Sequence, residues 1–226
     1  MTIHVLVEGL SERALLERWA PRLVDGDEVR IHPHQGKGEL PVDLAAAPDV
    51  KHRGLLDQLP AKLRGFANTV HAKAHRIVVL VDADEDDPAA LAASISAAAE
   101  TVAPNLSVTI RLAVEETEAF YLGDQKALKK AFPNADMVKA RSYEPDSIVG
   151  TWELFGEIVG DGGGNKVAWA EAMGPILTTT ASKSRSPSFR SLVGGLVALS
   201  APRPSAPPKR HYRHPARTTS KPDGRR

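Results

Sequence analysis

One stretch near the middle of the chain restricts the fold more than any other. Residues 77–81 are Ile-Val-Val-Leu-Val, five consecutive aliphatic residues with no polar break. Such a run predicts a strand buried on both faces, as in the middle of a parallel sheet covered by helices. An acidic segment, residues 82–87, follows directly. Because open α/β folds place their sites beyond the carboxyl ends of the strands, this segment is the first candidate site.

Two interpretations of the acidic segment remain open. Asp82 and Asp84 are two residues apart, so both point to one side if the chain stays extended there. Neighbouring carboxylates repel unless a cation lies between them, and Mg²⁺ prefers oxygen ligands. The alternative is a solvated loop in which Asp86 or Asp87 caps a helix that begins near Pro88. We favour metal binding for the first pair and the loop for the second.

Three further strands complete a predicted α/β fold. Residues 3–7 form a strand that ends at Glu8-Gly9, and a helix over 12–24 capped by Ser11 follows. Residues 29–34 form a shorter, alternating strand near an edge, and 106–114 form a strand that ends at Glu115-Glu116. Helices are expected over 55–69, where Pro60 leaves one kinked helix or two, and over 88–102. The expected fold is a Rossmann-like, mainly parallel sheet flanked by helices.

The carboxyl ends of parallel strands lie together, so acids that are distant in sequence can meet there. Glu8, the pair Asp82 and Asp84, and the pair Glu115 and Glu116 follow three different strands. We therefore expect them to surround one metal site.

The C-terminal half predicts helices and then a basic tail. Helices are expected over 124–132, 145–159, 166–177 and 192–199. Residues 200–226 hold eight Lys/Arg and one acid, a net charge of +7, whereas the rest of the chain has a net charge of −6. We predict an α/β core over 1–123, a helical extension packed on it over 124–199, and a disordered Pro/Arg-rich tail over 200–226.

Composition restricts the setting of the protein. The chain has no cysteine, which excludes disulfides and thiolate zinc sites. It shows no apolar run long enough to cross a membrane and no secretory signal at its start. We expect a cytoplasmic protein without a membrane partner.

Two other motifs carry less weight. The segment Gln35-Gly-Lys-Gly38 lacks the frame of a Walker phosphate loop. His32 and His34 would share one face of a strand, and we favour hydrogen-bonding or substrate-facing roles over metal binding because a third ligand is missing.

The ordered motifs resemble the Toprim domain of topoisomerases, primases and overcoming-lysogenisation-defect nucleases. They resemble most a Toprim-like family of small bacterial proteins of uncharacterised function, and the resemblance covers residues 2–199. The motifs are Val7-Glu-Gly-x-Ser-Glu12, His34-Gln-Gly-Lys37, Val81-Asp-x-Asp84, Val114-Glu-Glu-x-Glu-Ala-Phe120 and Ser186-x-Ser-Phe189.

The resemblance implies roles for individual residues. Glu8 would be the Toprim glutamate, a metal ligand or a general acid or base, and Asp82 and Asp84 would bind Mg²⁺, with Mn²⁺ as a substitute. Similarity to the nucleases adds Glu12 and Glu115 or Glu116 as ligands. Lys166 would face developing phosphate charge, although it can equally be a surface lysine at a helix start. Four residues would contact nucleic acid, DNA rather than RNA: His34, Lys37, Lys183 and Arg185.

Two functions from different classes follow from the resemblance. The first is a Mg²⁺-dependent nuclease, a defence or DNA-maintenance effector that works with a separate ABC- or AAA-type ATPase and can form a homo-oligomer. The second is a non-catalytic Toprim subunit that binds nucleic acid or regulates a partner. A phosphatase of the haloacid-dehalogenase type is disfavoured, because Glu85-Asp86 follow Asp84 and Glu8 has no use in it. An EF-hand loop fails because the mid-loop glycine and closing glutamate are absent.

Overall fold

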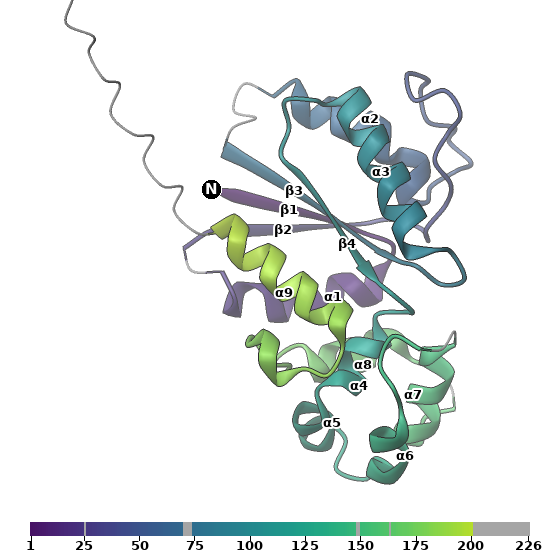
Figure 1. Ribbon diagram of the computed structural model, residues 1–226, viewed down its shortest axis with the longest axis vertical. Coiled ribbons are helices and arrows are strands. Elements are labelled where there is room, and N and C mark those ends of the chain that lie inside the picture. Colours follow the sequence, from purple (N-terminus) through teal and green to yellow (C-terminus); the bar gives the residue numbers. More distant parts are fainter. Residues whose placement is uncertain (25, 70–73, 148–149, 163, 201–226) are drawn as a thin grey trace, which may run out of the picture.

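The computed structural model contains a four-stranded, fully parallel sheet (Figure 1). It describes residues 1–24, 26–69, 74–147, 150–162 and 164–200, so the predicted disorder of the tail concerns residues that lie almost entirely outside this range. The strands are β1 (Thr2–Val7), β2 (Glu28–Pro33), β3 (His75–Asp82) and β4 (Val108–Ala113), in the order β2-β1-β3-β4. The predicted α/β class is confirmed, with β3 inside the sheet and β2 at an edge.

Helices follow the strands as the sequence indicates, with some extra short ones. They are α1 (Leu10–Trp19), α2 (Leu55–Ala67), α3 (Pro88–Val102), α4 (Glu118–Gly123), α5 (Gln125–Ala131), α6 (Met137–Ser142), α7 (Thr151–Val159), α8 (Lys166–Met173) and α9 (Pro187–Ser200), with 3₁₀ turns at Ala20–Arg22 and Ala181–Lys183. Helix α2 continues through Pro60 as one helix. Asp87 caps α3 by accepting a hydrogen bond from the N–H of Ala90, as its position before Pro88 predicts.

Two helical layers cover the sheet. Helices α2 and α3 lie on one face, where Leu59 and Leu63 pack with Ile77 and Val79. Helices α1 and α9 lie on the other face, where the ring centroids of Trp19 and Phe189 are 5.2 Å apart. Both faces of β3 are therefore buried, which is why its sequence is continuously aliphatic.

Helices α4 to α8 lie beyond the carboxyl ends of the strands and are called the helical part below (Figure 1). Helix α8 packs along α1, and α9 returns to pack on β4. The helical part therefore lies against the carboxyl edge of the sheet, where the acids were predicted to meet. No helix of the described part of the chain is long and apolar enough to cross a membrane.

Some local predictions were wrong. Ser11 does not cap the first helix, which begins at Leu10 after an extended Gly9; its hydroxyl donates to the Glu12 carboxylate at 2.8 Å instead. Helix α7 begins at Thr151 rather than 145, and α9 begins at Pro187 rather than 192. Helices α4 and α6 were missed because six residues are too few to show a helical period.

Candidate metal and catalytic site

The carboxyl ends of β1 and β3 are joined by a side-chain contact. Glu8 follows β1, and its Oε1 accepts a hydrogen bond of 2.8 Å from the backbone N–H of Asp82, the last residue of β3. These strands are neighbours in the sheet. The expected meeting of Glu8 and Asp82 therefore follows from strand order and the parallel direction.

Five acids interact at this edge of the sheet and are called the carboxylate cluster below. They lie in or directly after β1, α1, β3 and α4: they are Glu8, Glu12, Asp82, Asp84 and Glu118. Glu8, Asp82 and Glu118 have raised pKa values, and the charges of Glu12 and Asp84 help to raise those of Glu8 and Asp82. Four of the five were predicted as site residues from the sequence.

Glu12 reaches the cluster from the first turn of α1 and is 7 % exposed. A Cβ atom on Gly9 would lie 3.2 Å from Glu12 Oε2, closer than nearly all such contacts. Glycine at this position therefore leaves room for the Glu12 carboxylate against the backbone.

Asp82 and Asp84 do not extend side by side, contrary to expectation. Asp84 has a φ of 49°, in the left-handed region, so the chain turns immediately after the strand. Asp82 is partly buried, and its Oδ1 accepts a hydrogen bond of 3.1 Å from the Thr117 hydroxyl, while Asp84 is exposed. Left-handed backbone in a non-glycine residue is strained and is concentrated at functional sites.

Glu118 is the member that sequence reasoning missed as a site residue. It begins α4 and is 2 % exposed. The signal was present, because Glu118 is the third acid of the motif Val114-Glu-Glu-x-Glu, but only the first two were assigned. Glu115 and Glu116 were assigned because they come directly after the predicted strand. In the structure the chain turns into α4, and this turn brings Glu118 to the cluster instead.

Glu115 and Glu116 face the helical part instead. Glu115 is 3 % exposed and accepts hydrogen bonds from the hydroxyls of Tyr143, at 2.5 Å, and Thr151. Glu116 Oε2 accepts a hydrogen bond of 2.8 Å from the N–H of Trp152 at the start of α7. In this conformation Glu115 anchors the helices, and Glu116 lies at the border of the cluster through Lys166.

Burial and mutual repulsion perturb the carboxylate cluster. Burial raises the pKa of Glu8 to about 7, with the charges of Glu12 and Asp84 adding to the effect. Burial likewise raises the pKa of Glu118 to about 7. The pKa of Asp82 is raised well above its usual value by burial and then by the acids around it. At neutral pH the cluster therefore binds protons that isolated carboxyls would have lost.

Two lysines flank the carboxylate cluster from opposite parts of the chain. Lys37 Nζ lies 3.1 Å from Asp84 Oδ2 and 2.6 Å from Asp86 Oδ2 and donates to the carbonyl of Ala83. Lys166 Nζ lies 3.4 Å from Glu116 Oε1 and 3.9 Å from Glu118 Oε2.

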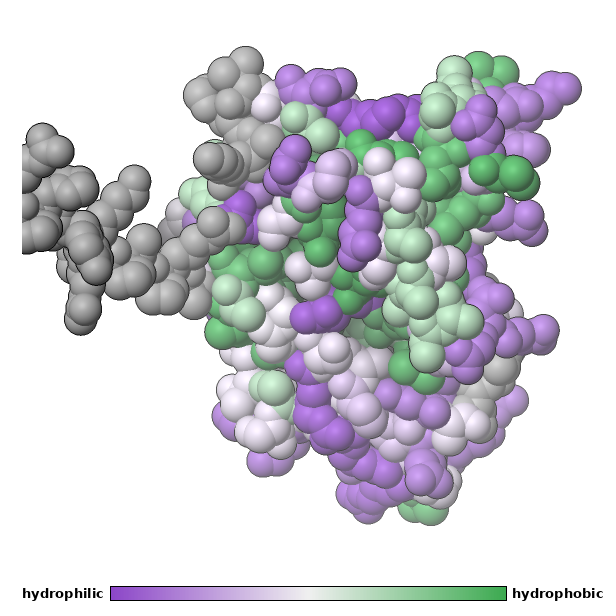
Figure 2. Space-filling view, turned by 45° about the horizontal axis from the view of Figure 1, so that its top comes forward, coloured by the Kyte–Doolittle hydropathy of each residue, from purple (hydrophilic) through white to green (hydrophobic). Residues whose placement is uncertain are grey.

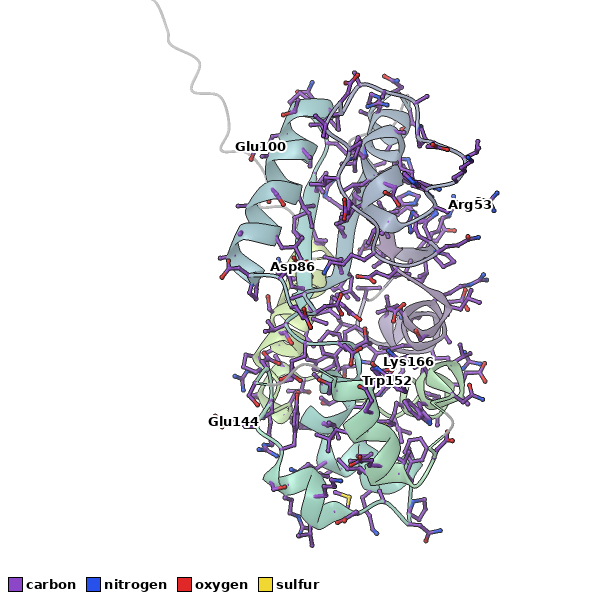
Figure 3. The ribbon with its side chains drawn as sticks, turned by 90° about the vertical axis from the view of Figure 1, so that its right-hand side faces the viewer. Arg53, Asp86, Glu100, Glu144, Trp152 and Lys166 are labelled. Carbon is purple, nitrogen blue, oxygen red and sulfur yellow. The ribbon has the colours of Figure 1, made fainter. Side chains whose placement is uncertain are left out.

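Lys166 is the better placed of the two lysines for a role inside the site. Its Nζ also lies 5.2 Å from the centre of the Trp152 ring. Figure 3 shows Trp152 and Lys166 together where the sheet meets the helical part. Burial lowers the pKa of Lys166, but the charges of Glu118, Glu116 and Asp82 outweigh it, so the net pKa is raised and the ammonium stays charged.

The residue types suit a hard divalent cation, since all five members offer carboxylate oxygens. Within the described residues, no three acid or histidine side chains are arranged as a ready-made metal site. A cation would therefore have to draw the carboxylates of Glu8, Asp82 and Glu118 into new rotamers. Such a cation would relieve the mutual repulsion that adds to the effect of burial on their pKa values.

The predicted nucleic-acid residues lie in different places. His34 is 9 % exposed, and its Nδ1 lies 2.7 Å from the Val7 carbonyl oxygen, so the side chain fixes the end of β1 in this structure. Lys37 lies beside the acidic loop. Lys183 and Arg185 are exposed on the helical part.

A row of histidines crosses the sheet away from the carboxylate cluster. His4 Nδ1 lies 2.9 Å from His32 Nε2, and His4 Nε2 lies 2.8 Å from His75 Nδ1. Burial lowers the pKa of His4 to about 4, with help from the two neighbouring rings. His32 is thus a hydrogen-bonding residue, the role that we favoured from the sequence.

The fold and the site together define an α/β protein with a carboxylate cluster at the carboxyl edge of a parallel sheet. The chain belongs to the family described as "Domain of unknown function (DUF4276)", whose pattern matches residues 7–197. No curated protein and no solved structure matches the chain. The family description assigns no activity, so the Toprim resemblance stays a prediction.

Proposed function

We propose that the protein is a Mg²⁺-dependent nuclease that hydrolyses phosphodiester bonds of nucleic acid. The observation that carries the proposal is the convergence of Glu8, Asp82 and Glu118 at one sheet edge, each with a raised pKa. The Toprim resemblance supports the same class of reaction. When bound, Mg²⁺ or Mn²⁺ would neutralise the negative charge that develops on the phosphate and the leaving oxygen.

Each residue has a role that its position supports. Glu8, Glu12, Asp82 and Glu118 would hold the cation, with Asp84 at the exposed side. Glu8 Oε1 already accepts the Asp82 N–H, which leaves Oε2 free to exchange a proton near neutral pH.

Lys166 supplies a fixed positive charge beside the carboxylates. Glu116, through Lys166 and the N–H of Trp152, positions that ammonium group. Positive charge held in place before the reaction stabilises negative charge that forms during it.

The resemblance alone suggests the setting of this activity. On that basis the proposal includes a cytoplasmic defence or DNA-maintenance role, a separate ABC- or AAA-type ATPase and a homo-oligomer.

The alternative is a non-catalytic subunit that binds nucleic acid or regulates a partner. The observation that favours it is the absence, among the described residues, of three donor side chains already arranged for a metal ion. A cation that only stabilised the fold would be consistent with this alternative.

The deciding experiment compares Asp82→Asn with Glu85→Gln. Both substitutions replace one carboxyl of the acidic segment 82–87 by an amide, but Glu85 is exposed and outside the carboxylate cluster. Purified protein is incubated with plasmid and single-stranded DNA in Mg²⁺, Mn²⁺ or EDTA. We expect cleavage in Mg²⁺ by the wild type and Glu85→Gln, and none by Asp82→Asn or in EDTA. Cleavage that survives both EDTA and Asp82→Asn would rule out the proposed site.

A further inference from the structure

A second charged surface lies on the helical part, away from the carboxylate cluster. Two adjoining cavities of about 510 and 490 Å³ share Gln125, Lys126 and Lys130. Six cationic side chains line them and are called the basic surface below: Lys126, Lys129, Lys130, Arg141, Lys183 and Arg185. This concentration of positive charge is unexpected in a body whose net charge is negative.

The spacing of the lysines on α5 creates this surface. Lys126 is three and four residues before Lys129 and Lys130, so all three side chains lie on one side of the helix. Ala127 and Leu128 occupy the opposite side and are buried in the core. Like charges at this spacing weaken a helix by about 0.2–0.5 kcal/mol per pair, and a bound anion would remove that penalty.

The cations of the basic surface are not neutralised by acids. The side chains of Lys126, Lys130 and Lys183 are exposed and make no hydrogen bond or ion pair with any described residue, whereas those of Lys37, Lys139 and Lys166 are paired with acids. Figure 2 shows a mostly hydrophilic surface over the lower part of the molecule, where these helices lie.

The one acid of the cavity wall, Asp124, does not compensate the charge. It is 6 % exposed, and its oxygens accept hydrogen bonds from the N–H groups of Ala127, at 3.0 Å, and Thr178, at 2.8 Å. Its carboxylate is therefore directed to the backbone rather than to the lysines.

Two successive hydrogen bonds link the basic surface to Glu115, just beyond the carboxyl end of β4. Arg185 donates to the carbonyl of Tyr143 at 2.8 Å, and the hydroxyl of Tyr143 donates to Glu115 at 2.5 Å. A longer bond of 3.5 Å to the carbonyl of Arg141 also holds the Arg185 guanidinium group, whose remaining N–H groups can donate to phosphate oxygens.

We propose that the basic surface binds the phosphodiester backbone of the nucleic acid whose cleavage is assigned to the carboxylate cluster. The inference rests on the proposed function and extends it by placing substrate contacts on α5, the end of α6 and residues 183–185. A row of cations along two adjoining cavities fits a ligand with repeated negative charges better than a single small anion. Contacts of this kind give affinity without sequence preference.

The test measures binding in EDTA, where cleavage does not occur. Fluorescently labelled single-stranded and duplex DNA is titrated with the full-length Lys126→Gln/Lys130→Gln variant and followed by anisotropy at several salt concentrations. The control, Lys51→Gln/Arg53→Gln, removes the same charge from the exposed loop, where Arg53 projects away from the sheet (Figure 3). Both variants keep residues 201–226, so any contribution of the tail is equal.

We expect the first variant to bind about tenfold more weakly and to lose about 1.5 to 2 from the slope of log K against log salt, because two phosphate contacts disappear. The control should resemble the wild type, and unchanged thermal midpoints would show that both variants fold. Equal binding by the two variants, no binding by the wild type, or equally tight binding of poly-glutamate would overturn the inference.

The outcomes separate this inference from the proposed function. If Mg²⁺-dependent cleavage is unchanged by substitution of Lys126 and Lys130, the proposed role of the basic surface is wrong and the nuclease proposal stands. If the lysines are needed for binding but no cleavage occurs, the basic surface stands and the nuclease proposal is wrong.

Discussion

The carboxylate of Glu8 accepts the backbone N–H of Asp82 across 2.8 Å, although the two residues are 74 positions apart in the sequence. The contact exists because β1 and β3 are parallel neighbours that end at the same edge. It uses one oxygen of Glu8, and Asp82 Oδ1 accepts the Thr117 hydroxyl, so Glu8 Oε2 and Asp82 Oδ2 are the oxygens left for other groups at that edge.

Replacing Glu118 by Gln should stabilise the cation-free protein above neutral pH. The usual pKa of this group is 4.5 and the folded value is about 7, so the folded state retains a proton that the unfolded chain releases. Its favourable contribution is thus complete below pH 4.5 and is lost as the pH rises through about 7. The free energy of unfolding is measured in urea with EDTA. Wild type and Glu118→Gln should have similar values at pH 5, and at pH 8 the variant should be more stable by on the order of 3 kcal/mol.

His4 provides the opposite pH dependence and a useful control. Its folded pKa is about 4, below the usual 6.5, so its contribution is present above pH 6.5 and is lost as the pH falls through about 4. His4→Gln should therefore change the free energy of unfolding mainly at acidic pH. It should leave unchanged the stability difference that Glu118→Gln produces at pH 8. A Glu118→Gln curve parallel to the wild type from pH 5 to 8 would contradict the raised pKa.

Replacing Lys166 by Met should slow the proposed cleavage by about 10²-fold, because a fixed positive charge facing the phosphate is lost. Lys166→Arg should retain part of the rate. Initial rates under saturating Mg²⁺ measure the effect, and Lys51→Met serves as a surface control. Lys166→Met should also raise the pKa of Glu118 further, since the ammonium lowers it now. Normal cleavage by Lys166→Met would make Lys166 a structural residue.

Tyr143→Phe should destabilise the protein by about 1–3 kcal/mol. The substitution removes a hydrogen bond to the buried carboxylate of Glu115 and leaves Thr151 as its remaining hydroxyl donor in the contacts described above. Urea unfolding of Tyr143→Phe, Glu115→Gln and the double variant gives the coupling between the two residues. Additive effects would show that the short contact contributes nothing specific.

Asp146→Ala should loosen the start of α9. Asp146 Oδ2 accepts the N–H of Ser188 at 2.9 Å, and its Oδ1 accepts both the Ser186 and Ser188 hydroxyls. Loss of a helix cap costs about 0.5–2 kcal/mol. Asp146→Asn should lose less, because asparagine still accepts hydrogen bonds and tolerates the φ of 63° at this position. Equal losses in the two variants, again from urea unfolding, would argue against the cap.

The central sheet could be predicted because each strand has a hydrophobic pattern that is recognisable in its own short segment of sequence. Residues 77–81 require burial on both faces, and the alternating residues 29–34 belong at an edge, where β2 lies. Glu8 and Asp82 then met as parallel geometry requires, whereas Glu115, at the end of β4, did not join them. Helix α3 was predicted with its cap because Asp87 and Pro88 are neighbours in sequence.

The rest of the site depends on contacts that no local pattern encodes. The left-handed turn at Asp84 separates it from Asp82, and nothing in the acidic segment indicates that turn. Glu115 turns away because Tyr143 and Thr151, from distant segments, bind it. The Ser186-x-Ser-Phe189 motif proved to be a helix cap completed by Asp146, which only the folded chain brings there.

The burial of the carboxylate cluster makes cation loading a proton exchange. Glu8 and Glu118 hold protons near neutrality, and a divalent ion can take their oxygens only by expelling them. In the proposed nuclease, each loading event therefore acidifies the medium slightly, and the heat measured in a calorimeter varies with the ionisation enthalpy of the buffer. In the proposed nuclease, a modest acidification of the surroundings would therefore release the ion and stop cleavage without any inhibitor.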